Sequence, residues 1–178
     1  MKTFMVILLL IGLTFSSYSQ DKKMENGEKG NVKFEELPAV VIKRAGADFS
    51  VYLPDKHPSK SVTDLQEKFV AYDLGKDYEG FESYLLIMQS KNRNLAATYN
   101  ENGKLIRVVE NYKNIRMPNS VIYSIYKNYP EWTVVKDKYT YTQEEGDILK
   151  KQYNVKIKKG KEIMRLKVND KGEILKAK

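Results

Sequence analysis

The sequence predicts an α+β protein of two tandem units, each a helix followed by an antiparallel meander, forming one extended sheet with the helices packed on one face. Short stretches that alternate apolar and polar residues predict strands, and two stretches have the apolar spacing of amphipathic helices. The third observation is an internal repeat. Tyr84 and Tyr153 lie 69 residues apart, and so do Gly103 and Gly172 in two polar turns. A constant offset is the signature of repeated units.

The N-terminus has the pattern of an export signal. An apolar run over 4–15 follows a lysine and is followed by small residues, so we expect cleavage before Gln20. The run is shorter than the roughly 20 residues that span a bilayer. We therefore expect a signal peptide over 1–19, no stable membrane insertion after its cleavage, and a periplasmic or secreted product. The alternative is a retained membrane anchor.

Composition bounds the chemistry of the 178-residue chain. It has no cysteine, which excludes disulfides, zinc–thiolate sites, iron–sulfur clusters and cysteine nucleophiles. Its net charge of +8 favours an acidic protein or an anionic component of the cell envelope as partner. The alternative is a charge that only serves solubility. An exported protein rarely meets nucleic acid, so we expect no nucleic-acid partner.

The segment 20–34 is polar and glycine-bearing, which predicts a flexible leader. The first unit is expected over 35–112. Ser61 and Asp64 have the spacing of a capping box, and the apolar residues after them predict a helix over 62–73. Strands are expected on both sides of this helix, at 39–42, 49–53, 84–89, 95–99 and 104–110. In the second of them, Phe49, Val51 and Leu53 alternate on one face.

The second unit is expected over 113–178. Pro118 suits the first turn of a helix whose apolar stripe begins at Val121, and Pro130 ends it. Four strands follow, at 132–142, 149–159, 162–168 and 173–177. A meander of this length can bury one face against a single helix.

No catalytic motif is present. His57 is the only histidine and lies between Lys56 and Pro58 in an expected loop, which favours a structural role. The acidic pairs at 35–36 and 144–145 are adjacent residues, whose side chains point apart in a strand. The chain has no phosphate-binding glycine loop, no dinucleotide fingerprint and no serine elbow. We therefore expect a protein that is not an enzyme, with no cofactor and no metal.

Two surface patches stand out as candidates for a ligand or partner. If the strands at 149–159 and 162–168 pair, Lys156, Lys158, Arg165 and Lys167 share the face opposite the apolar one. The alternative is ordinary solvated lysine. In the first unit, the offset of 69 places Ile87 at the position equivalent to Lys156, and Leu85, equivalent to Asn154, lies on the same face. This apolar patch is either covered, for instance by the N-terminal strands, or a contact surface.

The chain resembles the PepSY-like family of exported bacterial proteins, whose fold is similar to that of the β-lactamase-inhibitor protein. The resemblance covers roughly 60–178 and is better in the second half. The residues that carry it are Met117-Pro118, Tyr129-Pro130, Tyr153-Asn154-Val155, Val168-Asn169-Asp170-Lys171-Gly172-Glu173-Ile174, Tyr84 and Tyr99-Asn100-Glu101-Asn102-Gly103-Lys104-Leu105. It implies a non-enzymatic binding or inhibitory module of the envelope. The inhibitor has disulfides that this chain lacks, which argues against a shared target.

Three functions therefore remain open on the sequence. The first is an exported binding module that recognises a protein or an anionic envelope ligand through an open sheet face. The second is an inhibitor or chaperone of an exported hydrolase, either a protease or a β-lactamase. The third is an enzyme with an unrecognised site, which would require a cleft that gathers acids around Tyr139, Tyr141 or His57.

Overall fold

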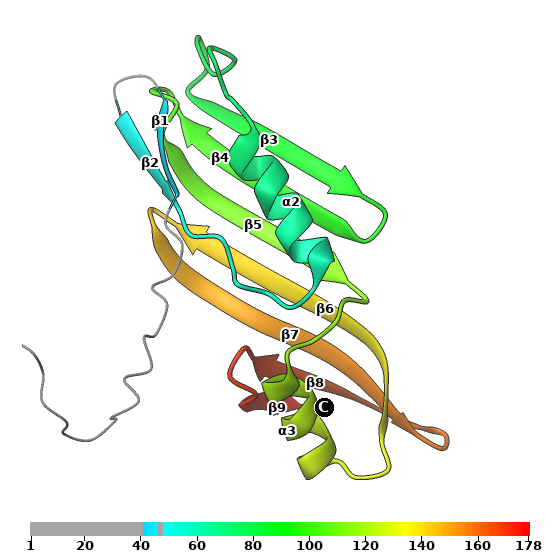
Figure 1. Ribbon diagram of the computed structural model, residues 1–178. Helices are drawn as coiled ribbons and strands as arrows, with labels where there is room; N and C mark the ends of the chain where they lie inside the picture. The colour runs from blue at the N-terminus through cyan, green and yellow to red at the C-terminus, as the bar shows by residue number, and fades with distance from the viewer. Residues whose placement is uncertain (1–40, 46–47) are drawn as a thin grey trace, which may run out of the picture. The chain divides into compact units, whose positions relative to one another are not determined.

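A computed structural model of the chain describes residues 41–45 and 48–178, and most of these form one antiparallel sheet (Figure 1). Its seven strands form a meander, in which each strand pairs with the next along the sequence. They are β3 (Ser83–Ser90), β4 (Arg93–Asn100), β5 (Leu105–Lys113), β6 (Thr133–Glu144), β7 (Asp147–Lys159), β8 (Glu162–Asn169) and β9 (Ile174–Ala177). A separate hairpin of β1 (Val41–Ala45) and β2 (Asp48–Tyr52) precedes them. The α+β class is confirmed.

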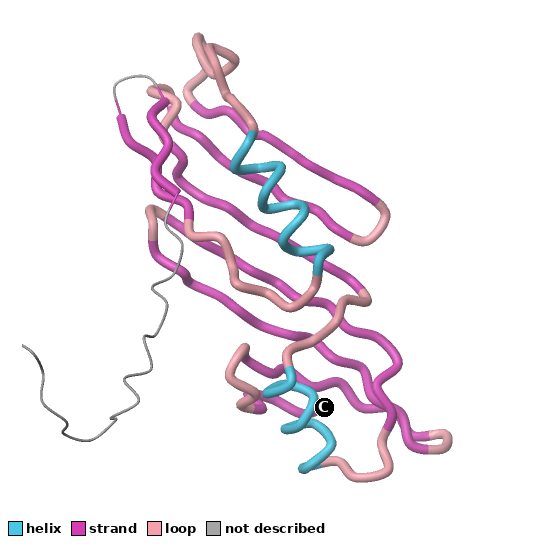
Figure 2. Tube along the Cα trace, viewed as in Figure 1, coloured by secondary structure: helices cyan, strands magenta, loops and turns pink. Residues whose placement is uncertain are grey.

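Two helices lie on the same face of the sheet (Figure 2). Helix α2 (Lys60–Ala71) packs on β4, and α3 (Asn119–Asn128) lies at the β8–β9 end. Each buries an apolar stripe, with Val62, Leu65 and Phe69 in α2 and Val121 and Ile125 in α3. Neither helix is long and apolar enough to cross a membrane, and the part of the chain described here contains no other.

The predicted capping box at Ser61 is wrong. Helix α2 begins at Lys60, two residues earlier than expected, and its N-cap is Ser59, which makes no side-chain cap bond. The amide of Ser59 donates to Nδ1 of His57 at 3.1 Å, and its carbonyl accepts from the amides of Val62 and Thr63. This local bonding turns the chain into the helix before Ser61, which is therefore already inside the first turn.

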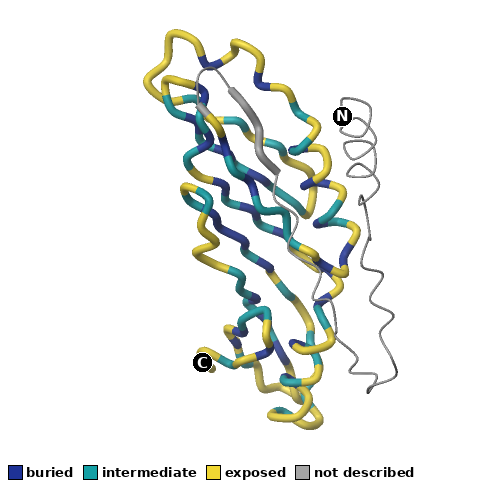
Figure 3. The backbone as a smooth tube through the Cα atoms, turned by 60° about the vertical axis from the view of Figure 1, so that its left-hand side comes forward, coloured by how far each residue is buried: buried dark blue, intermediate teal, exposed yellow. Residues whose placement is uncertain are grey.

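The hydrophobic core lies between the helices and the inner face of the sheet (Figure 3). On β7, Tyr153, Val155 and Ile157 are buried, and on β8 Leu166 and Val168 are buried, as their alternation predicts. Full burial of each such aliphatic side chain stabilises the fold by about 1.5–3 kcal/mol relative to exposure. The opposite face of the sheet consequently receives the polar residues between them.

Strand β2 packs on the helix side of the sheet, against β5. Ser50 Oγ accepts from the amide of Leu105 at 2.7 Å, and the Tyr52 hydroxyl donates to Glu110 at 2.6 Å. The inner residues of β2 are therefore Ser50 and Tyr52, whereas Phe49 is 62% exposed. Burying Tyr52, whose hydroxyl has a hydrogen-bond partner, is more favourable than burying the face of Phe49, Val51 and Leu53 that the alternation predicts.

The two turns that define the internal repeat have the same hydrogen bonds. Asn100 Oδ1 accepts from the amides of residues 102 and 104, and Asn169 Oδ1 accepts from those of residues 171 and 173. Gly103 and Gly172 both have positive φ, 74° and 91°. Their neighbours differ, because Gly103 faces the ring of Tyr78 and Gly172 faces the backbone of α3.

Replacement of Gly172 by alanine tests this close approach. A Cβ at residue 172 would lie 2.5 Å from the carbonyl oxygen of Ser120, where the backbone cannot yield easily. We expect Gly172→Ala to lower the free energy of unfolding in urea by about 2–4 kcal/mol, combining backbone strain with overpacking. The matched control is Gly160→Ala, which also has positive φ but nothing within 4 Å of its Cβ. Equal losses in the two variants would contradict the close approach.

Candidate functional site

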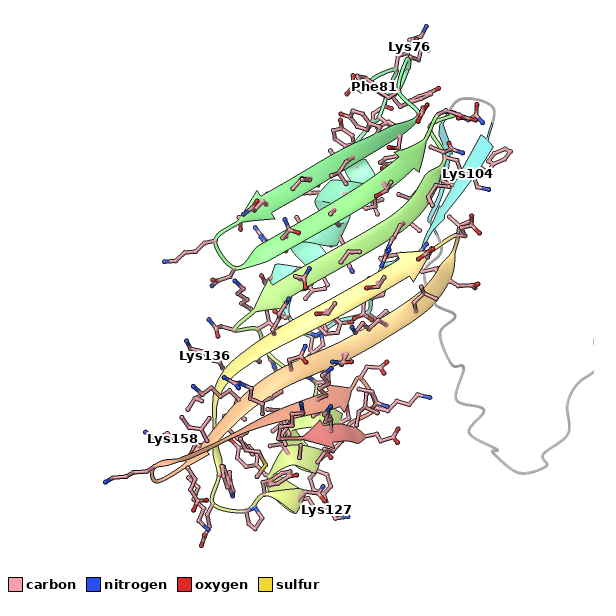
Figure 4. The ribbon with its side chains drawn as sticks, turned by 180° about the vertical axis from the view of Figure 1, so that it is seen from behind. Lys76, Phe81, Lys104, Lys127, Lys136 and Lys158 are labelled. Atoms are coloured by element: carbon pink, nitrogen blue, oxygen red, sulfur yellow. The ribbon has the colours of Figure 1, made fainter. Side chains whose placement is uncertain are left out.

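The face of the sheet turned away from the helices is the candidate binding surface (Figure 4, where Lys158 is labelled). The strand register places on it the four cations that the sequence analysis expected there. Lys156 on β7 lies directly opposite Arg165 on β8. Lys158 is paired with Ile163, and Lys167 with Asn154. Because the flanking residues Val155, Ile157 and Leu166 are buried in the core, the cationic side chains project from the other face. Their role in binding stays a prediction.

The strand register adds further cations that the sequence analysis did not find. One row crosses five strands and contains Lys113, Lys138, Asn154, Lys167 and Lys176, each paired with the next. A second row contains Lys136, Lys156 and Arg165, and the backbone of Lys178 bonds to that of Arg165. The signal available in the sequence was the alternation of Lys136 with Lys138. Only the register of β6 against β5 and β7 shows that they join the same surface.

These cations line a groove of about 670 Å³ on the open face. Its charged lining comprises Lys113, Lys136, Lys138, Lys156, Arg165, Lys167, Lys176, Lys178 and one acid, Asp137. No ion pair joins any of these eight cations to a carboxylate within the described residues. Lys158 lies on the same face beyond the lining of the groove. The groove is therefore a concentrated positive surface.

The single acid does not neutralise this surface. Asp137 Oδ2 accepts a hydrogen bond from the amide of Ile115 at 3.0 Å. Burial raises the pKa of Asp137, and this backbone bond opposes the rise. The carboxyl group of Asp137 therefore bonds to the backbone of the connection between β5 and α3.

Placing so many like charges together costs free energy. Neighbouring strands lie about 4.8 Å apart, and cations directly opposite one another repel. At about 5 Å in water the repulsion of one pair is of the order of 0.8 kcal/mol before salt screening. An anion in the groove would convert this repulsion into attraction, which favours binding of negative charge.

The other end of the same face is apolar. Leu85 and Ile87 on β3 are 56% and 53% exposed. They lie opposite Thr98 and Ala96 of β4, as the internal offset predicts. The expectation that the N-terminal strands cover Leu85 and Ile87 is wrong for β2, because β2 packs on the helix side of the sheet. Three strands separate β3 from β7, so one small ligand cannot contact both patches.

A buried polar cluster lies on the helix side, centred on Glu110 of β5, whose side chain is 0% exposed. Its carboxylate accepts hydrogen bonds from Tyr52 at 2.6 Å, from Tyr112 at 2.5 Å and from Gln66 at 2.9 Å. Burial raises the pKa of Glu110, while the three donors act in the opposite direction. Burial and the neighbouring Glu110 raise the pKa of the Tyr52 and Tyr112 hydroxyls, so both stay protonated donors.

The segment between β2 and α2 bonds to the sheet through Asp55. Its carboxylate accepts from the Tyr139 hydroxyl at 2.6 Å and pairs with Lys151 Nζ at 2.7 Å. Its amide donates to Gln66 at 2.9 Å, so Gln66 links Asp55 with Glu110. Gln143 and Tyr141 add bonds to the backbone at Leu53. These contacts hold the segment against β6 and β7.

His57 is buried in this cluster, although the sequence placed it in a loop. Its Nε2 lies 2.7 Å from the Tyr153 hydroxyl, and its Nδ1 accepts from the amide of Ser59. Because Nδ1 is an acceptor, the neutral ring carries its proton on Nε2 and donates it to Tyr153. Burial lowers the pKa of His57; Asp55 opposes this shift, and Lys151 adds to it.

The arrangement does not favour catalysis. Glu110, Tyr139 and His57 are all buried, and their polar atoms bond to one another or to the backbone. A hollow of about 410 Å³ beside α2 reaches Asp55 and Gln66, but both are already paired within the cluster. Among residues 41–45 and 48–178, no group of three histidine or acidic side chains could hold a metal ion. The cluster can instead fix the fold.

No protein-family model and no curated protein matches the sequence. The chain is similar to the solved structure of a BLIP-like protein from Bacteroides fragilis, at 14% identity and a TM-score of 0.31, over 58% of this chain and 79% of that one. It is also similar to a DUF2874 family protein from Bacteroides ovatus, at 14% identity and a TM-score of 0.33, over 70% of this chain and 88% of that one. Such scores carry no functional argument, and membership of the PepSY-like family stays a prediction.

The lowered pKa of His57 predicts a stability that falls on acidification. Above pH 6.5 the ring is neutral in both states. As the pH falls below 6.5, His57 binds a proton in the unfolded chain but stays neutral in the folded protein. The free energy of unfolding therefore falls by at most about 1.4 kcal/mol per pH unit, until the pH reaches the pKa of His57 in the folded protein. We expect wild type to lose more stability than His57→Gln between pH 7.5 and 5.5 in urea unfolding. Glu110, whose raised pKa has the opposite effect, is common to both proteins. Identical losses would contradict a neutral buried His57.

Proposed function

We propose that this chain is a non-enzymatic, exported binding module that holds an anionic partner in the groove on the open face of its sheet. One observation carries the proposal: eight cations surround this groove, and none is paired with a described carboxylate. Charge that serves only solubility can be spread over the whole surface, whereas these cations lie together around one groove. Complementary charge both attracts a partner over distance and orients it.

The two cationic rows favour an extended partner over a compact one. Along a strand, side chains on one face recur about every 6.8 Å, and across strands they recur about every 4.8 Å. A linear chain of phosphates or carboxylates can follow either direction, so that several of its charges meet cations at once. The partner we propose is therefore an acidic protein segment or an anionic polymer of the envelope.

The proposal includes the organisation expected from the sequence. The signal peptide over 1–19 and the leader over 20–34 lie outside the described residues, and export rests on the sequence pattern alone. The two units, 35–112 and 113–178, divide the open face between them. In this view the second unit, with Lys156, Lys158, Arg165 and Lys167, provides the anion site. The first, with Leu85 and Ile87, provides a separate apolar contact.

Charge reversal on the open face, at three cations of the groove and at the adjoining Lys158, tests the proposal. We expect the fourfold variant Lys156→Glu, Lys158→Glu, Arg165→Glu and Lys167→Glu to weaken binding of both inorganic polyphosphate and poly-glutamate by at least about 100-fold, measured by calorimetry at low salt. For wild type, the logarithm of affinity should fall linearly with the logarithm of salt concentration, because bound counterions are exchanged.

The control carries the same change in net charge at cations outside the groove. It replaces Lys68, Lys104, Lys127 and Lys171 by Glu. Loss of affinity in the groove variant with little change in the control supports a local site. Equal losses in both variants would mean that net charge alone attracts the probe, and the proposal would fail. Binding of poly-glutamate without polyphosphate would identify the partner as a protein.

A further inference from the structure

A row of uncharged polar side chains lies on the open face beside the cationic row that runs from Lys113 to Lys176, here called the long row. Asn111 on β5 is paired with Thr140 on β6, and Thr140 is paired with Gln152 on β7. Each is partly exposed, and each lies two positions along its strand from a member of the long row. Residues two apart in a strand project from the same face, about 6.8 Å from each other. These three side chains, which we call the polar row, therefore run parallel to the cations.

The hydrogen bonds of the polar row leave polar groups for a ligand. Thr140 Oγ1 donates to Asn111 Oδ1 at 3.3 Å, and Gln152 Nε2 donates to Asn154 Oδ1 at 3.1 Å. An amide side chain has two N–H donors and an oxygen with two lone pairs, so one bond uses only part of its capacity. The polar row and Asn154 thus present both donors and acceptors at the open face.

The groove also combines its cations with neutral groups and an acceptor. Asn154 interrupts the long row between Lys138 and Lys167. Asn114 and Asp137 are part of the groove lining. A polymer of phosphates alone has no hydrogen to donate to the Asp137 carboxylate. A ligand that carries hydroxyl groups as well as acids can donate to this carboxylate and can bond to both asparagines.

We propose that the groove binds an acidic polysaccharide, a linear chain of uronic-acid sugars that crosses the strands. Its carboxylates lie against the lysines of the long row, and its hydroxyls bond to the polar row and to Asn154. This inference rests on the anion site of the proposed function and names the chemical class of its ligand. Hydrogen bonds from lysine to carboxylate are charge-assisted and supply affinity. The neutral amides supply selectivity, because a site that hydrogen-bonds hydroxyl groups disfavours ligands that lack them.

The spacing of the cations favours a sugar chain over an acidic protein segment. The long row contains four cations over five strands. Along a single strand of the open face at most two cations follow one another, as Lys136 and Lys138 do on β6. A partner that crosses the strands therefore meets more charge than one that follows a strand. Neighbouring strands lie about 4.8 Å apart, close to the length of one pyranose ring, whereas an extended peptide repeats its side chains on one side only about every 6.8 Å.

The first test compares two polyanions that differ in their hydroxyl groups. Wild-type protein is titrated by calorimetry with polygalacturonate and with poly-glutamate of equal charge number, at the same low salt concentration. We expect polygalacturonate to bind at least about tenfold more tightly, because poly-glutamate has no hydroxyl groups for the polar row. Polygalacturonate whose carboxylates are fully methyl-esterified should not bind, because it cannot pair with the lysines.

The second test removes amides of the polar row without a change in charge. We expect the double variant Asn111→Val and Gln152→Val to bind polygalacturonate about tenfold more weakly than wild type, with unchanged affinity for poly-glutamate. Valine suits a strand, and both positions are partly exposed, so the unfolding transition should stay close to that of wild type. The matched control is Ser83→Val with Thr98→Val, on β3 and β4 of the same face, which should bind both polymers like wild type.

The outcomes separate this inference from the proposed function. Wild-type protein that binds poly-glutamate as tightly as polygalacturonate would overturn the polysaccharide and leave the anion site intact. Tighter binding of poly-glutamate would overturn it in favour of an acidic protein segment. A polar-row variant that keeps full affinity for polygalacturonate, or that loses both polymers equally, would also overturn it. Absence of binding to polygalacturonate, poly-glutamate and polyphosphate alike would overturn the inference and the proposed function together.

Discussion

The described fold depends most on the hydrogen bonds that the buried carboxylate of Glu110 accepts. Removing a carboxylate from water costs several kcal/mol unless hydrogen bonds replace its hydration. Here three donors do so, and they come from β2, α2 and β5 itself. The carboxylate thus joins the N-terminal hairpin and the first helix to the centre of the sheet. It specifies that both pack on one face, because only there can their donors reach it.

The open face follows from this constraint. With the helices, β2 and the Leu53–Ser59 segment bonded to the inner face, the described residues leave the other face of the sheet to solvent (Figure 4). That face is divided along the sheet, with apolar side chains at the β3 edge and cations from β5 to β9. The division gives this face two surfaces of different chemistry, one apolar and one that suits negative charge.

The sequence was sufficient to predict the sheet, because its strands alternate strictly where one face is buried. Leu166 is buried and Lys167 exposed, as the alternation predicts. It also placed α3, since prolines mark its limits. It failed at Ser61, where local hydrogen bonds of His57 and Ser59 start the helix earlier. It also failed at Phe49, where hydrogen bonds of Ser50 and Tyr52 with distant residues of β5 decide which face of β2 is buried. Tyr52 is buried because Glu110, 58 positions away, accepts a hydrogen bond from its hydroxyl, and no local pattern carries that information.

The candidate site was only partly predictable for the same reason. The cations of β7 and β8 follow from a single hairpin, whose register the sequence indicates. Lys113, Lys138 and Lys176 join them only through the pairing of β5 with β6, of β6 with β7 and of β8 with β9. Irregularities shift the register of β6 against β7 at two places and that of β8 against β9 near Lys167. The burial of His57 was missed because a loop histidine has no periodic signal.

We propose that the open face of the protein binds an anion, while buried hydrogen bonds hold the other face. A titration of the isotope-labelled protein with inorganic polyphosphate, followed by amide chemical shifts, tests this proposal. The account predicts that the largest changes fall on β6, β7 and β8, at Lys138, Lys156 and Lys167, while the amides of α2 and of the Asp55–His57 segment stay constant. Changes centred on α2 and the hollow beside Asp55, with the groove unaffected, would contradict it.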